Sequence, residues 1–355
     1  MMMTPGPTEL PHTVKEAIAR TIENPDIQEE FFDFYHLLEN DLQELYDTED
    51  DIVILGGEGI LGLEASIASL IDEGDKVLCI SNGIFGDGFA NFVEMYGGEA
   101  VMCEFPYDQP MVLEKVEEYL DQHDFKAATM VHCETPTGTL NDLEPILKRL
   151  KEENILTVVD AVSSVGGVPV PVEHMDICIA GSQKCLSSPP GLTTLSVSEE
   201  AWRCITEGGR GDRHFYTSLK VWKKEWLEEE HFPYTPLVSN LYALKESVEL
   251  ILEEGLPYVY ARHEESAKIC RERGKQMGLK LFPKQADLCS NTVTAFRVPG
   301  KARQIQKEMR EKHDILLATG LAGLKDDIIR VGHMGFNAKR EKVKKTMDAL
   351  EKVLR

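Results

Sequence analysis

The sequence is short of positive charge. Its 355 residues include 38 Lys and Arg against 61 Asp and Glu, which gives a formal net charge of −23. Because an acidic surface repels phosphate backbones and anionic headgroups, we expect neither nucleic acid nor a membrane surface as a partner. Long apolar runs are also missing, since no stretch approaches the roughly 20 residues that span a bilayer. The first residues, MMMTPGPTELP, lack the basic start and apolar core of a signal peptide.

Clustered cysteines are absent too. The eight cysteines are scattered, with no CxxC pair and no cluster flanked by histidine. This spacing argues against a zinc site and against a disulfide framework, so we expect no metal and a reduced, cytoplasmic location. The chain length predicts two domains, or one large α/β domain with an appendage.

Short apolar runs alternate with amphipathic stretches through the first two thirds of the chain. The runs are bounded by Gly, Asp or Asn and predict buried strands, with helices between them. The expected strands are 52–55, 76–80, 127–132, 155–160 and 176–180, and the expected helices are 61–71, 87–96, 111–122 and 143–153. Such repetition predicts an α/β fold with a mainly parallel sheet covered on both faces.

The pattern changes after about residue 230. A long helix is expected over 240–254, ending at Gly255, and the charged segment 223–230 is interpreted as a solvated helix face. The last hundred residues predict a smaller α+β unit. Its expected elements are helix 258–277, strand 292–298, helix 302–312, strand 328–331 and helix 339–353.

A glycine-rich turn follows the first predicted strand. Residues 56–59 read Gly-Gly-Glu-Gly and lead directly into a helix. Backbone N–H groups and the positive end of the helix dipole suit a phosphate at such a place. A simple tight turn is an equally good interpretation of this turn taken alone.

Two ionisable residues end neighbouring strands. Asp160 closes the run ILTVVD, where an unpaired charge would be costly, so it is expected to face a cation or a protonated ring nitrogen. Lys184 follows the strand at 176–180, where partial burial favours a nucleophilic amine. The alternatives are a helix N-cap for Asp160 and a surface position for Lys184. With the glycine turn, the two residues supply the three contacts that pyridoxal phosphate needs.

At this point the sequence resembles the class V, fold-type I aminotransferases that use pyridoxal 5′-phosphate, in the alanine–glyoxylate and serine–glyoxylate or serine–pyruvate branch. The motifs that carry the resemblance are TPGPT (4–8), LEAS (63–66), NGIFG (82–86), HCETPTG (132–138), VVDAVSSVGG (158–167), GSQKCLSSPPG (181–191) and IIRVGHMGFN (328–337). The resemblance implies a mainly parallel seven-stranded sheet flanked by helices. It also implies an N-terminal arm (1–14), a large cofactor-binding domain (15–254) and a small C-terminal α+β domain (255–355).

The resemblance assigns roles around the cofactor ring. Lys184 would form the Schiff base and shuttle the proton, and Asp160 would keep the ring nitrogen protonated. Phe85 would stack on the ring, and Thr135 would lie beside its phenolic oxygen. Arg330 would bind the α-carboxylate of the substrate in a planar, two-pronged contact.

The resemblance also implies a phosphate site and a subunit interface. Gly59 and Ile60 would donate backbone N–H groups to the phosphate, and Gln183 its side-chain amide. Members of the family are homodimers with shared active sites, so Thr235 would reach the partner's phosphate. The arm with Pro5 and Gly6 would line the substrate pocket.

Some residues depart from the family pattern. Glu58 puts a carboxylate into the phosphate turn, and Phe232 stands where relatives often have a tyrosine. The motif HCET at 132–135 also resembles 2-aminoethylphosphonate transaminases, whereas Gln183 and the PPG turn favour the glyoxylate and pyruvate branch.

The predicted activity is therefore a ping-pong transamination. An amino group would pass from a small L-amino acid, alanine or serine, to a 2-oxo acid, glyoxylate or pyruvate. Alternatives on the same fold are a 2-aminoethylphosphonate–pyruvate transaminase and a Cβ lyase or cysteine desulfurase, for which Cys289 is the one loop candidate. A non-catalytic binding protein is a further alternative.

Overall fold

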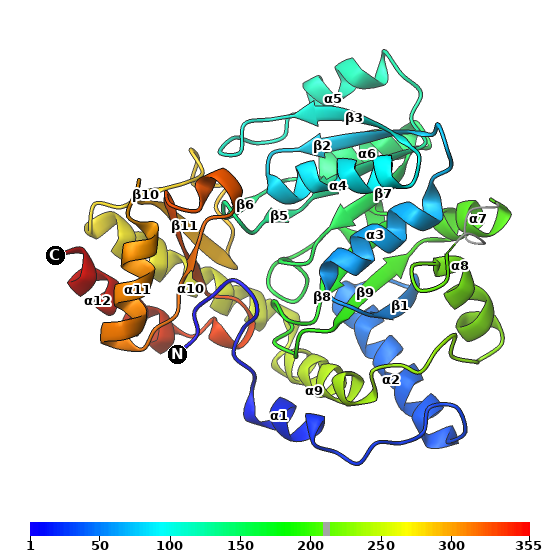
Figure 1. The fold of residues 1–355 in the computed structure, drawn as a ribbon, viewed down its shortest axis with the longest axis horizontal. Coiled ribbons are helices and arrows are strands. Elements are labelled where there is room, and N and C mark those ends of the chain that lie inside the picture. The colour runs from blue at the N-terminus through cyan, green and yellow to red at the C-terminus, as the bar shows by residue number, and fades with distance from the viewer. Residues whose placement is uncertain (209–213) are drawn as a thin grey trace.

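The computed structural model describes residues 1–208 and 214–355 as a large α/β part and a smaller α+β part (Figure 1). The large part is built on a seven-stranded sheet in the order β1-β9-β8-β7-β4-β2-β3. Its strands are β1 (Asp51–Gly56), β2 (Lys76–Ser81), β3 (Glu99–Glu104), β4 (Ala127–Val131), β7 (Leu156–Asp160), β8 (Ile177–Gly181) and β9 (Leu192–Val197). The predicted sheet is confirmed.

The strands of this sheet run mainly in one direction. Strands β8, β7, β4, β2 and β3 pair in parallel, whereas β9 is antiparallel to both of its neighbours, β1 and β8. Strand β1 therefore points the same way as β8. The carboxyl ends of β1, β2, β4, β7 and β8 consequently lie along one edge of the sheet, where open α/β sheets bind their ligands.

Helices precede, connect and follow these strands along the chain. They are α1 (His12–Ile18), α2 (Glu29–Tyr46), α3 (Gly59–Leu70), α4 (Ile84–Met95), α5 (Leu113–Leu120), α6 (Glu144–Glu152), α7 (Glu199–Glu207), α8 (Leu219–Trp222), a π-helix (Lys223–Glu228) and α9 (Val238–Glu254). Helices α3 and α4 cross the sheet on the side toward the viewer, and α6 lies behind it (Figure 1). The nearly continuous apolar strands are thus covered on both faces, as parallel sheets require.

The smaller part contains a four-stranded antiparallel sheet in the order β10-β11-β13-β12. Its elements are α10 (Leu256–Gln276), β10 (Lys280–Leu281), β11 (Val293–Arg297), α11 (Ala302–His313), β12 (Ala318–Thr319), β13 (Ile328–Gly332) and α12 (Arg340–Leu354). The short strands β5 (Cys133–Glu134) and β6 (Thr139–Leu140) form a hairpin, and 3₁₀ turns span Val172–His174, Ala322–Leu324 and Gly335–Asn337.

The hydrophobic core is divided in the same way. One cluster fills the space around the large sheet, and a second joins β11, β13, α11 and α12. Met3 belongs to this second cluster, so the N-terminus is anchored on the small part, and both chain ends lie there (Figure 1). Helix α10 contributes Val259 to the first cluster and Cys270 to the second. The proposed division at residue 254 stays a prediction.

The charged segment 223–230 differs from its interpretation as a solvated helix face. It forms the π-helix, and its Trp226 is buried at 1% exposure, stacked on Phe232 with ring centroids 4.2 Å apart. The Trp226 indole N–H donates to Glu39 at 2.6 Å. The side chain of Trp226 therefore anchors this charged segment on the core.

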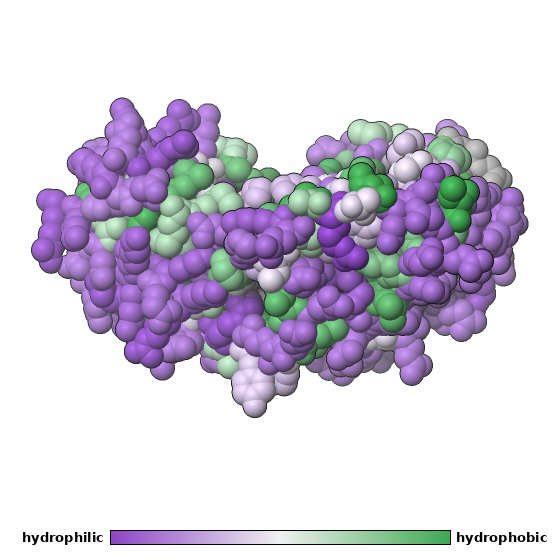
Figure 2. All heavy atoms as spheres, turned by 90° about the horizontal axis from the view of Figure 1, so that it is seen from below, coloured by the Kyte–Doolittle hydropathy of each residue, from purple (hydrophilic) through white to green (hydrophobic). Residues whose placement is uncertain are grey.

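The surface is mostly polar. Figure 2 shows one face on which hydrophilic side chains dominate and hydrophobic ones form separate small patches. Within residues 1–208 and 214–355, none of the helices combines the length and the apolar character needed to cross a membrane.

Candidate active site

The predicted site residues gather at the carboxyl edge of the large sheet. Glu58 and Gly59 follow β1, Phe85 follows β2, Thr135 follows β4, Asp160 ends β7, and Lys184 follows β8. Together with Gly6, Pro7, Ile60, Leu63, Val162, Gln183 and Pro190 they line one cavity of about 400 Å³. Topology thus brings together residues that are up to 184 positions apart in the sequence (190 − 6).

Lys184 lies at the floor of this cavity. Its Nζ donates a hydrogen bond to the carbonyl oxygen of Pro5 at 2.8 Å. Burial, together with the positive charge of Arg330, lowers the pKa of Lys184 from its usual value. A larger share of the amine is therefore unprotonated near neutral pH, as a nucleophile requires.

The N-terminal arm lies directly against this lysine. Gly6 has φ +88°, and a Cβ atom at this position would come within 2.3 Å of Lys184 Cδ. Only glycine therefore allows the backbone to approach so closely. Thr8 continues the contact, since its N–H donates to the carbonyl of Gln183 at 3.1 Å and its hydroxyl to that of Lys184 at 3.2 Å.

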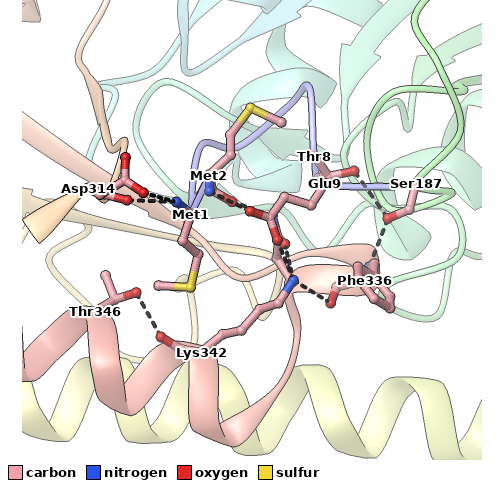
Figure 3. A network of polar contacts seen from close by, with 10 residues as sticks. Met1, Met2, Thr8, Glu9, Ser187, Asp314, Phe336, Lys342 and Thr346 are labelled. Atoms are coloured by element: carbon pink, nitrogen blue, oxygen red, sulfur yellow. Dashed lines mark hydrogen bonds and ion pairs between the residues drawn. The ribbon is translucent and has the colours of Figure 1, made fainter. Parts of the chain in front are cut away.

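A network of polar contacts ties the arm to the small part (Figure 3). The carboxylate of Glu9 accepts from the Met2 N–H and from Lys342 of α12, both at 2.7 Å. The Thr8 hydroxyl bonds Ser187 at 3.1 Å, and Ser187 accepts from the Phe336 N–H at 2.8 Å. The arm therefore links α12 to the loop that carries the lysine.

Asp160 is 5% exposed at the end of β7. Its Oδ1 accepts the N–H of Val162 at 2.9 Å. Burial raises its pKa to about 6, although the nearby charge of Lys184 acts in the opposite direction. The carboxyl group is therefore mostly ionised at neutral pH and can accept a hydrogen bond from a protonated ring nitrogen.

Glu134 supports the aromatic side of the cavity. Its carboxyl oxygens accept the N–H of Gly86 at 2.7 Å and that of Phe85 at 3.3 Å, in the first turn of α4. A Cβ atom at Gly83 would lie 2.2 Å from the Glu134 carboxyl carbon, so the glycine makes room for it. Burial raises the pKa of Glu134 to about 8.

Thr135 and Arg330 meet on the opposite side. The Thr135 hydroxyl bonds the hydroxyl of Ser163 at 2.5 Å. The guanidinium of Arg330 donates to the carbonyls of Thr319 at 2.7 Å and of Thr135 at 3.2 Å. Arg330 is 7% exposed, and burial lowers its pKa to about 10, so it remains charged. Among the described residues, no carboxylate pairs with it.

The phosphate turn has a different geometry from the one expected. Helix α3 begins at Gly59, with Glu58 as its N-cap. Glu58 Oε1 accepts the N–H of Ile60 at 3.3 Å, and Oε2 accepts from Gln183 Nε2 at 3.2 Å. Two of the predicted phosphate donors are therefore bonded to a carboxylate of the chain itself.

Pro5, Arg330 and Thr235 are predicted site residues that do not line the cavity. Pro5 and Arg330 contact the lining residues Lys184 and Thr135, whereas Thr235 lies apart. It is exposed in the loop before α9 and does not line the cavity of the single chain. Its predicted role depends on a partner subunit and stays a prediction. Phe232, the second departure from the family pattern, is buried in the aromatic core beside Trp226.

The residues present fit the ring of pyridoxal phosphate. Asp160, Lys184, Phe85 and Thr135 border one cavity. At the phosphate end, the Oε1 atom of Gln183 is buried and has no hydrogen-bond partner within the described part of the chain. This orphaned oxygen is an acceptor, so it indicates a place for a hydrogen-bond donor of a ligand.

Sequence reasoning missed two supporting residues, Glu134 and Ser163. Both lie inside motifs that carried the family resemblance, but their partners, Gly86 and Thr135, come from other strand ends. Residues 1–208 and 214–355 bring no three His, Cys, Asp or Glu side chains together as metal ligands.

The comparisons with known proteins agree with this geometry. The class-V aminotransferase family model matches residues 4–345. An uncharacterized aminotransferase from Methanocaldococcus jannaschii is 39% identical over 96% of this chain and 89% of its own length. A pyridoxamine–pyruvate transaminase from Mesorhizobium japonicum is 32% identical over 94% of this chain and 86% of its own.

A solved structure supports the same assignment. The alanine–glyoxylate aminotransferase of Nostoc sp. superposes with a TM-score of 0.96 at 28% identity, covering 100% of this chain and 95% of the other. The matched family model spans nearly the whole chain. The chain therefore belongs to the class-V aminotransferases, which are enzymes that depend on pyridoxal phosphate.

Proposed function

We propose that the protein moves an amino group from a small L-amino acid, alanine or serine, to glyoxylate or pyruvate by a ping-pong mechanism. The cofactor, when bound, supplies a carbonyl that condenses with amines and a ring that withdraws electrons from the substrate Cα. The chain itself has to bind the substrate, hold the ring and move one proton.

Two buried side chains divide the proton chemistry between them. The carboxylate of Asp160 holds a proton on the ring nitrogen, which keeps the ring electron-withdrawing. Lys184 Nζ holds the cofactor and, once released, takes the proton from the substrate Cα. Its lowered pKa supports this role, because an unprotonated amine is the form that can accept a proton.

The single observation that carries the proposal is Arg330. Its guanidinium is buried beside Lys184 without a carboxylate partner among the described residues, although burying an uncompensated charge is costly. A substrate α-carboxylate would provide that partner in a two-pronged contact. Both half-substrates should therefore carry an α-carboxylate, and 2-aminoethylphosphonate, which lacks one, should be a poor donor.

The neighbouring assignments belong to the same proposal. We propose a homodimer in which Thr235 reaches the partner's phosphate site, with Pro5 and Gly6 lining the substrate pocket. Free thiols support a cytoplasmic location, and Cys79, Cys103, Cys133, Cys178, Cys185, Cys270 and Cys289 are such thiols. Against a desulfurase, the Cys289 thiol is 8% exposed, and burial raises its pKa, which disfavours the thiolate that such chemistry needs.

An absorbance experiment tests the proposal. Protein saturated with pyridoxal phosphate is mixed with single amino acids in the absence of an oxo acid. L-alanine or L-serine should convert the cofactor to its amino form, and glyoxylate or pyruvate should restore the starting spectrum. Release of ammonia or sulfide without an acceptor would instead indicate a lyase, and no conversion by any α-amino acid would refute transamination.

A second candidate uses pyridoxamine as the amino donor to pyruvate, as the name of the Mesorhizobium relative states for that protein. The observation that favours it is the Glu58 carboxylate bonded to two predicted phosphate donors. Pyruvate consumption with free pyridoxamine as the sole donor separates it from the first candidate.

A further inference from the structure

We propose that the Glu58 carboxylate occupies the phosphate cradle, which is the turn at residues 56–60 together with Gln183. A vitamin B6 form with a 5′-phosphate must then displace this carboxylate in order to bind. Glu58 then determines how strongly the site prefers phosphorylated over unphosphorylated forms. The inference rests on the proposed function only in that Lys184 accepts a vitamin B6 aldehyde in this cavity.

The hydrogen bonds of Glu58 use donors that a bound phosphate would also need. One carboxylate oxygen accepts the Ile60 N–H at 3.3 Å and the other accepts from Gln183 Nε2 at 3.2 Å. These donors follow two different strands, are 123 positions apart (183 − 60) and converge only in the folded chain. A phosphate that used either donor would have to replace a carboxylate oxygen there.

The charges that line the cavity do not offset the repulsion between Glu58 and a phosphate. Of the described lining residues, Glu58 and Asp160 are acidic, and Lys184 is the one cation. Lys184 is committed to the aldehyde end of the ligand. Within one subunit the phosphate end therefore offers backbone N–H groups, the α3 dipole and Gln183, but no described side-chain cation. A bound phosphate beside Glu58 would meet repulsion at short range.

Water can replace the two hydrogen bonds of the carboxylate when a ligand displaces it, because Glu58 is exposed. Glu58 is exposed at the mouth of the cavity and caps α3 through its side chain. A shorter residue such as serine can cap the same helix end. The buried Oε1 of Gln183 has no partner among the described residues and, being an acceptor, suits a ligand hydroxyl and not a phosphate oxygen. An unphosphorylated ligand could donate its hydroxyl to Glu58 and leave the carboxylate in place.

Three variants separate displacement from general effects. Glu58→Ser keeps a helix cap and opens the cradle, and Glu58→Gln removes the charge while keeping the size. Glu64→Gln is the matched control, because it makes the same charge change on the same helix at a carboxylate that bonds Tyr96 instead of the cradle. Apo-protein is titrated with pyridoxal 5′-phosphate, pyridoxal and inorganic phosphate, and dissociation constants are read from tryptophan fluorescence and calorimetry.

Glu58→Ser should tighten pyridoxal 5′-phosphate binding by a factor on the order of ten or more and change pyridoxal binding less than about threefold. The affinity of Glu58→Gln for pyridoxal 5′-phosphate should lie between those of Glu58→Ser and the parent, and the affinity of Glu64→Gln should equal that of the parent. The affinity for inorganic phosphate should change in the same direction as the affinity for pyridoxal 5′-phosphate. Unchanged or weaker phosphate-form binding by Glu58→Ser, or equal changes for both aldehydes, would overturn the proposal.

A covalent readout keeps this result distinct from the proposed function. Borohydride treatment of each mixture, followed by peptide mass analysis, reports whether Lys184 is joined to the aldehyde. Absence of labelling in the parent and in every variant would refute the proposed function. Labelling of Lys184 with no change in selectivity at Glu58→Ser would refute the role of Glu58 alone.

Discussion

Arg330 shows how one side chain can restrict a substrate class. Its guanidinium donates to two carbonyls, which fix its plane, and no described carboxylate neutralises it. Lys offers a point charge in place of the planar fork, so Arg330→Lys should keep the attraction but lose the two-pronged geometry. We expect KM for the amino acid to rise about tenfold to a hundredfold, with a smaller change in kcat.

Steady-state kinetics with the preferred amino donor check this prediction. Arg303→Lys, on the exposed face of α11, is the matched control and should leave both constants unchanged. An Arg330→Lys variant with the parent's KM would show that the α-carboxylate binds elsewhere.

Glu134 makes stability depend on pH. Burial raises its pKa to about 8 in the folded protein, compared with 4.5 for an ordinary glutamate. Between these two values the folded state keeps the proton and the unfolded state loses it, so this group lowers the free energy of unfolding as the pH rises. Glu134→Gln cannot ionise, so its stability relative to the parent should improve from pH 5 to pH 8 by on the order of 3 kcal/mol.

Urea unfolding of the apo-protein at the two pH values measures this difference. The variant also loses one acceptor for the Phe85 and Gly86 N–H groups, but that loss is the same at both pH values. The exposed Glu73→Gln should show no such trend. A stability difference that does not change with pH would contradict the buried, protonated state.

At the scale of elements, strands with a buried apolar pattern were predicted and the others were not. Strands β1, β2, β4, β7 and β8 all appear within a few residues of their expected positions. Strand β9 was missed because it reads LTTLSV, and its buried hydroxyls are satisfied only by distant partners. Thr193, for example, donates to the Ala180 carbonyl at 2.8 Å on the neighbouring strand. Strand β3 was missed because it is an edge strand with glutamate at both ends.

The same distinction holds for the site. Lys184 and Asp160 were predictable because each belongs to a strand end, and parallel strands bring such ends together, whereas Thr135 was predicted only through the family resemblance. The contact between Pro5 and Lys184 joins residues 179 positions apart, and the Glu58–Gln183 bond joins residues 125 positions apart. No local pattern encodes such pairings. Only the resemblance suggested the arm, and nothing suggested that Glu58 would bond the phosphate donors.

The arm gives a prediction at this scale. Gly6→Ala would add a Cβ within 2.3 Å of Lys184 Cδ at a backbone position with φ +88°. The arm must then shift away from the lysine, and we expect kcat/KM to fall about tenfold or more through misplacement of the amine. Limited proteolysis should also cut the arm faster than in the parent.

Gly74→Ala is the control for backbone strain. Gly74 has a similar φ of +84°, but nothing lies within 4 Å of its added Cβ. Both variants should lose about 1 kcal/mol of stability, because alanine tolerates this conformation poorly. Only Gly6→Ala should lose activity. Equal kinetics for the two variants would mean that the arm does not position Lys184.

At the scale of the whole molecule, the single chain leaves the predicted phosphate contact of Thr235 unmade. Thr235 is exposed and lies outside the cavity lining. If a partner's Thr235 completes each cavity, Thr235→Glu should weaken pyridoxal 5′-phosphate binding about tenfold in a homodimer, since it adds a like charge beside the phosphate. The purified parent should also sediment as a dimer.

Mixed dimers decide whether the site is shared. A Lys184→Ala subunit cannot hold the cofactor covalently but still supplies an unchanged Thr235 to its partner. A Thr235→Glu subunit keeps Lys184 and receives that threonine, so a hybrid of the two should regain parental affinity and activity at one of its two sites. Differently tagged subunits, co-expressed and purified through both tags, provide the hybrid. If each site is confined to a single chain, the hybrid should show only the weak binding of the Thr235→Glu subunit. If Thr235 plays no part in binding, both the hybrid and the Thr235→Glu homodimer should bind the cofactor with parental affinity.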